Sequence, residues 1–98
     1  MPIDNLYEKS LRHGLEYIHT VAARRGWNKG TLMPAFDVGR VPGTYQEHTL
    51  RISLGEIHVS TEGIPHEWIE IGTGFIDTRF SQRIAALLSE LQKKLTGV

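Results

Sequence analysis

The sequence contains no cysteine, carries no net charge and has no long apolar run. The absence of cysteine among its 98 residues excludes a disulfide scaffold, a thiol nucleophile and a cysteine-ligated zinc site. The longest uninterrupted apolar stretch, Ile84–Leu88, is far shorter than the roughly 20 residues that a membrane-spanning helix needs. Eleven basic residues balance eleven acidic ones, which disfavours nucleic-acid binding through bulk charge but not through a local basic patch.

The composition is that of a globular protein. Hydrophobic residues make up 40% of the chain and charged residues 22%, and a chain of this length can bury one core. We therefore expect a single domain that spans residues 1–98. The start of the chain has neither the basic segment nor the apolar segment of a secretory signal peptide, so we expect a cytoplasmic protein that does not span a membrane.

Two segments have the periodicity of amphipathic helices. Apolar residues recur at spacings of three and four over about residues 5–25, with Gly14 inside this helix at a cost of roughly 1 kcal/mol against alanine. This glycine indicates a close approach to a sheet. The second helix should begin at Asp77 or Thr78, and its apolar stripe consists of Phe80, Ile84, Leu87, Leu88, Leu91 and Leu95.

Between the helices the apolar residues alternate, which predicts strands. Residues 55–56 are Gly-Glu, a pair that fits a two-residue hairpin loop of type II′. That turn would pair Leu54 with Ile57 and Ile52 with Val59. Both pairs are apolar and would lie on the same face, as a half-buried sheet requires.

A third strand is predicted at Glu67–Ile71, after a second turn. Its alternation places Ile69 inward and Trp68 and Glu70 outward, on the open face of the sheet. Tyr45 should lie further along the same face.

The segment 27–43 is rich in glycine and proline and is predicted to be a long loop. Within it, residues 31–38 offer an alternative, a short edge strand, because proline is tolerated at the edge of a sheet.

These elements predict an α+β fold. The order helix, three strands, helix is typical of a two-layer sandwich, in which an antiparallel three-stranded meander has two helices on one face and leaves the other face open.

No pattern of side chains indicates catalysis. The sequence has neither a Gly-x-Ser-x-Gly elbow nor a His-Glu-x-x-His zinc motif. His13, Glu16 and His19 share one side of the first helix, but that side is expected to be a solvated polar face. We expect a protein without metal, cofactor or enzymatic activity.

The favoured function is a non-catalytic protein–protein interaction module or homodimer. A three-stranded meander has two unpaired edges, which proteins cover or use for association, and exposed aromatic residues are typical of interfaces. The partner-binding residues predicted on the open face are Trp68, Tyr45, Arg51 and Glu70.

Charge is unevenly distributed along the chain. Residues 44–77 contain one basic and six acidic residues, a net charge of −5, whereas residues 1–30 carry +2 and residues 78–98 carry +3. An acidic sheet repels phosphate, so nucleic acid would have to bind the helical side.

The predicted order of elements is similar to that of the double-stranded RNA-binding domain. Gly63, Pro65 and His66 resemble part of that family's Gly-Pro-x-His loop, although they come one hairpin later. The family places a lysine cluster at the start of its second helix, and the matching stretch 78–83 has none. The function of that family is therefore not assigned to this chain.

The segment Thr49–Gly63 is similar to a hairpin of some ribosome hibernation factors. That family binds the small ribosomal subunit through a basic surface, and the resemblance covers 15 of 98 residues. It makes RNA or ribosome binding the alternative function. The residues predicted to contact nucleic acid in that case are Arg24, Arg25, Lys29, Arg79 and Arg83.

Overall fold

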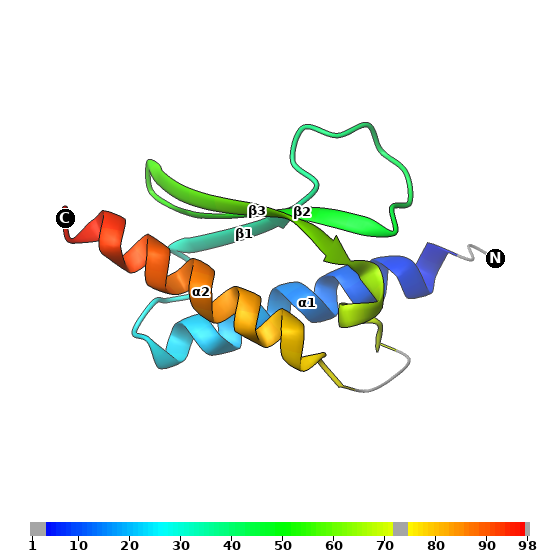
Figure 1. The fold of residues 1–98 in the computed structure, drawn as a ribbon, viewed down its shortest axis with the longest axis horizontal. Helices are drawn as coiled ribbons and strands as arrows, with labels where there is room; N and C mark the ends of the chain where they lie inside the picture. The colour runs from blue at the N-terminus through cyan, green and yellow to red at the C-terminus, as the bar shows by residue number, and fades with distance from the viewer. Residues whose placement is uncertain (1–3, 72–74, 98) are drawn as a thin grey trace.

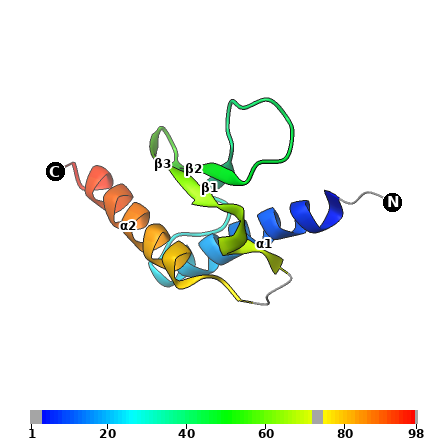
Figure 2. The ribbon, with the colours of Figure 1, turned by 45° about the vertical axis from the view of Figure 1, so that its right-hand side comes forward.

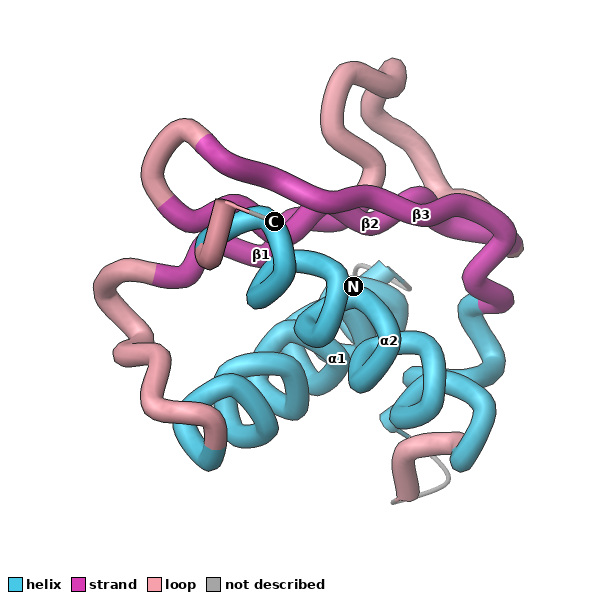
Figure 3. Tube along the Cα trace, turned by 60° about the vertical axis from the view of Figure 1, so that its left-hand side comes forward, coloured by secondary structure: helices cyan, strands magenta, loops and turns pink. Residues whose placement is uncertain are grey.

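The computed structural model describes residues 4–71 and 75–97, which form two layers (Figure 1). Both helices lie on the same side of an antiparallel three-stranded sheet, as Figure 3 shows, so the predicted α+β sandwich is confirmed. None of the helices in the described part of the chain has the length and apolarity of a membrane crossing. The elements in chain order are α1 (Asp4–Arg24), β1 (Leu32–Phe36), β2 (Glu47–Leu54), β3 (Ile57–Pro65), the 3₁₀ helix η1 (His66–Ile69) and α2 (Thr78–Leu95).

The central hairpin has the predicted register. Leu54 pairs with Ile57 and Ile52 pairs with Val59. Gly55 has a φ of +65°, which the first central residue of a type II′ turn requires. The alternation of β2 and β3 therefore places their apolar side chains against the helices.

A β-bulge interrupts the hairpin near its open end. His48 pairs with Ile64 and Leu50 pairs with Thr61, so two residues of β3, Glu62 and Gly63, lie opposite one residue of β2. Gly63 has a φ of +72°, which a residue with a side chain rarely adopts. The extra residue shifts the alternation of β3, and Ile64 is completely buried as a result.

The third strand is not where the alternation predicted it. It is β1, inside the predicted loop, and it pairs with β2 from Leu32 opposite Leu54 to Phe36 opposite Leu50. The alternative of an edge strand within residues 31–38 is thereby confirmed. Pro34 lies in the middle of this strand, where only one side of the backbone is paired.

The prediction of a strand at Glu67–Ile71 was wrong. The bulge lets β3 continue to Pro65, so Gly63, Ile64 and Pro65 of the expected second turn (residues 63–66) belong to β3. The backbone N–H of His66 donates to the carbonyl of Gln46, and the chain then coils into η1.

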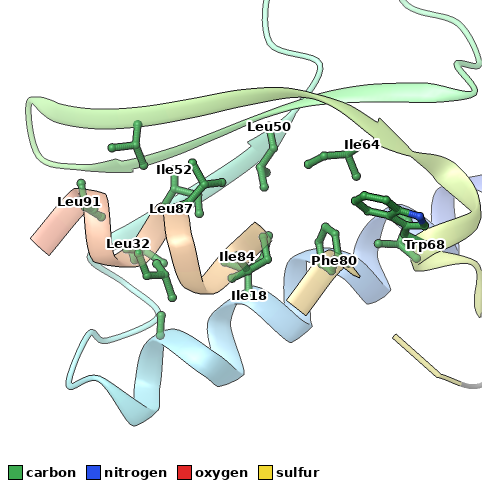
Figure 4. Close-up of a cluster of buried hydrophobic side chains, with 14 residues drawn as sticks. Ile18, Leu32, Leu50, Ile52, Ile64, Trp68, Phe80, Ile84, Leu87 and Leu91 are labelled. Atoms are coloured by element: carbon green, nitrogen blue, oxygen red, sulfur yellow. The ribbon is translucent and has the colours of Figure 1, made fainter. Parts of the chain in front are cut away.

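Trp68 consequently lies in the core and not on the open face. Helical geometry in η1 replaces the expected alternation, and Trp68 is only 8% exposed. Figure 4 shows it beside Phe80, at the end of the core nearest Ile64. The guanidinium groups of Arg79 and Arg83 lie 5.2 and 5.6 Å from the centre of its ring.

Gly14 marks the predicted close approach of α1. A Cβ atom at this position would lie 3.1 Å from Cγ2 of Ile69 and 3.2 Å from Cζ of Phe36. The helix backbone therefore lies directly against η1 and the end of β1.

α2 begins with a side-chain cap, and a glycine follows the end of α1. The carboxylate of Asp77 accepts the N–H of Arg79 at 2.8 Å and caps α2. After α1, Gly26 has a φ of +92° and the N–H of Trp27 donates to the carbonyl of Ala22, which is a Schellman motif.

Replacing Trp68 with alanine tests its place in the core. We expect the free energy of unfolding to fall by about 3–5 kcal/mol, because the variant leaves a large cavity. The half-buried Trp27 is the matched control, and its replacement with alanine should cost less. Urea denaturation followed by circular dichroism measures both, and a loss below about 1 kcal/mol for Trp68→Ala would contradict a core position.

Candidate functional site

The four residues predicted to bind a partner do not share one surface. Trp68 is buried, whereas Arg51 is exposed on the open face of the sheet, opposite Ser60 of β3. Tyr45 lies in the loop before β2, and Glu70 follows η1. These last two do come together, because both line a pocket at the end of the sheet that lies next to η1.

The five basic residues predicted to contact nucleic acid are also divided. Arg25 donates to Oγ of Ser89 at 3.3 Å, and Arg83 donates to Oγ1 of Thr61 at 3.2 Å and to the carbonyl of Glu62 at 3.1 Å. Arg79 holds the carboxylate of Asp77 through two side-chain hydrogen bonds. Only Arg24 and Lys29 are exposed without a contact of this kind among the described residues.

A fully buried histidine organises the site. His48 takes an inward position on β2, in line with the core residues Leu50 and Ile52, and its exposed fraction is 0%. Its Nδ1 lies 2.6 Å from Oδ2 of Asp37, and its Nε2 lies 2.8 Å from Nδ1 of His66. Both ring nitrogens are therefore satisfied, as burial of a polar group requires.

Asp37 is held in place by three donors. It follows β1 with a φ of +56°, the one positive value at a residue other than glycine in the described ranges. Its Oδ1 accepts a hydrogen bond from the N–H of Thr49 at 3.0 Å and another from Nη1 of Arg40 at 2.8 Å. Burial opposes the charge, but the hydrogen bonds from His48 and Thr49 hold the pKa of this carboxyl below its usual value.

His66 connects the buried pair to α1. Its ring stacks on Tyr7 with centroids 4.5 Å apart and planes 12° apart. The hydroxyl of Tyr7 in turn accepts the N–H of Tyr45 at 2.7 Å. Burial is the main cause that lowers the pKa of His66 and His48 is the second, while Glu70 and Asp37 oppose the shift.

The chain of contacts brings four segments to one place. Figure 2 shows the loop 37–46 rising from the sheet on the side away from the helices, and the first turns of α1 lying near η1. Asp37 comes from the start of this loop, His48 from β2, His66 from η1 and Tyr7 from α1.

The pocket beside His66 has a volume of about 580 Å³ and is acidic. Its lining includes three carboxylates, two phenols and one imidazole, and among the described residues that line it there is no lysine or arginine. Arg40, in the loop 37–46, has its guanidinium 3.6 Å from the centre of the Tyr45 ring. The lining residues are Tyr7, Thr44, Tyr45, Gln46, Glu47, Pro65, His66, Glu67 and Glu70.

A second hollow lies on the open face, with a volume of about 400 Å³. Arg51 lines it together with Val38 and Glu62. Among the described residues that line it, Arg51 and Glu62 carry opposite charges, so this hollow has no excess of either sign.

His13, on the polar side of α1, is half-buried against the last residue of η1. Nδ1 of His13 lies 3.4 Å from the carbonyl oxygen of Ile69. Over residues 4–71 and 75–97, no group of three or more histidine, aspartate or glutamate side chains is placed to hold a metal ion.

Sequence reasoning missed Asp37, His48, His66 and Tyr7. One signal was available: His48 shares the parity of Leu50 and Ile52, and a polar residue at an inward position of a strand needs buried partners. The partners themselves lie in distant segments. Comparisons with protein-family models, with curated proteins and with solved structures found no match.

The lowered pKa of His66 predicts how stability depends on pH. As the pH falls through 6.5, the unfolded chain binds a proton at this residue and the folded chain does not, so the free energy of unfolding decreases until the folded pKa is passed. His19 contributes in the same direction, because burial and then Lys29 lower its pKa while Glu16 opposes.

Urea denaturation at pH 7.5 and pH 5.5 measures this dependence. We expect the wild-type protein to lose more stability over this range than His66→Gln does, and His19→Gln to remove a separate part of the loss. His58→Gln, which removes an exposed imidazole from the open face, is the matched control. An unchanged pH dependence in His66→Gln would show that this residue contributes nothing.

Proposed function

We propose that the protein is a non-catalytic interaction module that binds a basic segment of a partner protein in the acidic pocket. One observation carries this proposal: Glu47, Glu67 and Glu70 meet at a pocket that also contains Tyr7 and Tyr45 and has no cation in its described lining. The interaction function itself was expected from the sequence, but the surface is a different one.

Electrostatics supports a cationic occupant. The three carboxylates come from β2, from η1 and from the residue that follows η1, and like charges at one site attract a cation. The pocket volume is within the roughly 300–1,000 Å³ that is usual for ligand sites. A lysine or arginine side chain would bring the opposite charge and an aliphatic stem to this lining.

Aromatic side chains support the same conclusion. Tyr45 already has the guanidinium of Arg40 over its ring, at 3.6 Å from the ring centre. Tyrosine rings attract guanidinium and ammonium groups through the negative face of the π system. Arg40 thus occupies one face of this ring and shows the kind of contact that a tyrosine of the lining makes with a guanidinium group.

The charges at the pocket favour a partner protein over a nucleic acid. Phosphates would be repelled by the pocket, and three of the five basic residues predicted for RNA contact are engaged within the protein. RNA binding, homodimer formation and a cytoplasmic location stay predictions. A second copy of the chain, through the exposed Arg24 or Lys29, is an outcome of the test below.

Titration with a short peptide tests the proposal. We expect a five-residue peptide with two arginines to shift the backbone amide signals of Tyr45, Glu47 and Glu67 in two-dimensional NMR spectra. An otherwise identical peptide with two glutamates should not shift them. Glu47→Gln and Glu67→Gln should each weaken binding roughly twofold to fivefold, since exposed ion pairs contribute up to about 1 kcal/mol.

Glu56→Gln is the matched control for these variants. It removes the same charge at the hairpin turn, at the opposite end of the strands from the pocket, and should leave the affinity within about twofold of wild type. Equal weakening by all three variants, or equal binding of the acidic peptide, would contradict the proposed site. Signal changes at these residues on dilution of the protein alone would assign the pocket to a second copy.

A further inference from the structure

The contacts of Asp37, His48 and His66 form a continuous chain from the loop through the core to the pocket. Asp37 and His48 are joined at 2.6 Å, and the two histidines are joined at 2.8 Å. The middle residue is completely buried, so water does not compete for either contact. Each proton in this chain is therefore positioned by the groups themselves.

The chain fixes the proton positions when both imidazoles are neutral. A carboxylate only accepts, so the proton of His48 must be on Nδ1, facing Asp37. Its Nε2 then has a lone pair, and the contact with His66 requires that Nδ1 of His66 donates. Since a neutral imidazole has one N–H, Nε2 of His66 has a lone pair as well.

This last lone pair is accessible from the pocket. The ring of His66 lines the pocket, and Nε2 has no hydrogen-bond partner within the described residues. It is also not one of the buried polar atoms without a partner there, which are Nδ1 of His19 and Nε1 of Trp68. Tyr7 covers a face of the ring and leaves its edge for a ligand.

A proton that binds at Nε2 changes the site in the same way wherever the charge settles. In one case the proton stays on Nε2 and His66 becomes an imidazolium. In the other case the Nδ1 proton of His66 moves to Nε2 of His48, and His48, next to Asp37, becomes the imidazolium. In both cases Nε2 of His66 becomes a donor, and the pair of histidines carries one positive charge.

We propose that Nε2 of His66 accepts a hydrogen bond from the arginine or lysine side chain that occupies the pocket, and that uptake of one proton at this nitrogen releases it. This inference rests on the proposed function of the pocket and adds the contact and its regulation. The released partner loses an acceptor and meets a like charge in the same step.

Other groups around His66 set the pH at which the partner is released. Burial and His48 lower the pKa of His66, while Glu70 and Asp37 raise it, and the net direction is downward from 6.5. The release is therefore expected on the acidic side of neutrality. The titratable and charged groups that face His66 or share its pocket are Tyr7 from α1, Asp37 with Arg40 from the loop, Glu47 and His48 from β2, and Glu67 and Glu70 from its own segment.

Measuring the tautomer of His66 tests the proposed hydrogen-bond directions without any ligand. Long-range ¹⁵N NMR spectra of the imidazole at pH 8 should show the proton on Nδ1, which is the less common tautomer of histidine. A proton on Nε2 at this pH would overturn the inference, because the pocket would then hold a donor in the neutral state.

Peptide affinity as a function of pH tests the release. The dissociation constant of the two-arginine peptide for the wild-type protein should rise as the pH falls from 8 to 5, approaching tenfold per pH unit below the transition, as uptake of one proton requires. His66→Gln keeps an oxygen acceptor in the side chain but cannot titrate, and its affinity should depend less on pH. His58→Gln is the control and should behave as wild type.

The outcomes separate this inference from the proposed function. Binding at pH 8 with the same pH dependence in wild type and His66→Gln would overturn the proton-linked release and leave the acidic pocket as a binding site. No binding of the peptide at any pH would overturn both the occupant and its release.

Discussion

One extra residue in β3 determines where the site can form. Glu62 and Gly63 lie opposite the single residue between His48 and Leu50. This bulge shifts the inward and outward alternation of the side chains at the end of β3 by one residue. Without it, Ile64 would face away from the helices, and the side chain that follows Pro65 would leave the sheet on another side. With it, Ile64 is buried and His66 reaches the nitrogen of a histidine from the neighbouring strand.

The same bulge explains why a series of hydrogen-bonded polar side chains can enter the core. A buried imidazole is costly unless both nitrogens find partners, and the partners of His48 come from its two sides: Asp37 from the loop after β1 and His66 from η1, directly after β3. Asp37 reaches this position only with a backbone in the left-handed region, which aspartate tolerates better than most residues. Loss of either partner would leave a buried polar atom unsatisfied, so the loop, both strands and η1 depend on one another.

Much of the fold could be predicted from the sequence because its signals are local. The hairpin follows from strict alternation and one glycine turn, and the helices follow from apolar spacing and caps. β1 has a proline and weak alternation, and only pairing with β2 makes it a strand. Trp68 was placed outside because alternation was carried past Pro65, where the chain coils. Tyr45 and Glu70 were selected for a shared sheet face and instead share a pocket, since tertiary packing joins their segments.

The distribution of charge differs between the helices and the acidic end of the sheet. Arg25, Arg79 and Arg83 act within the molecule. Arg25 connects the end of α1 to α2, Arg79 holds Asp77, which caps α2, and Arg83 joins α2 to β3. The acidic residues of the segment 44–77 follow another pattern, since three of them gather at a pocket whose described lining contains no cation. Clustered like charges repel one another, and this repulsion destabilises a folded protein. A positively charged occupant would reduce this repulsion, and this is the physical reason why we propose recognition at the acidic end of the sheet and not at the basic helices.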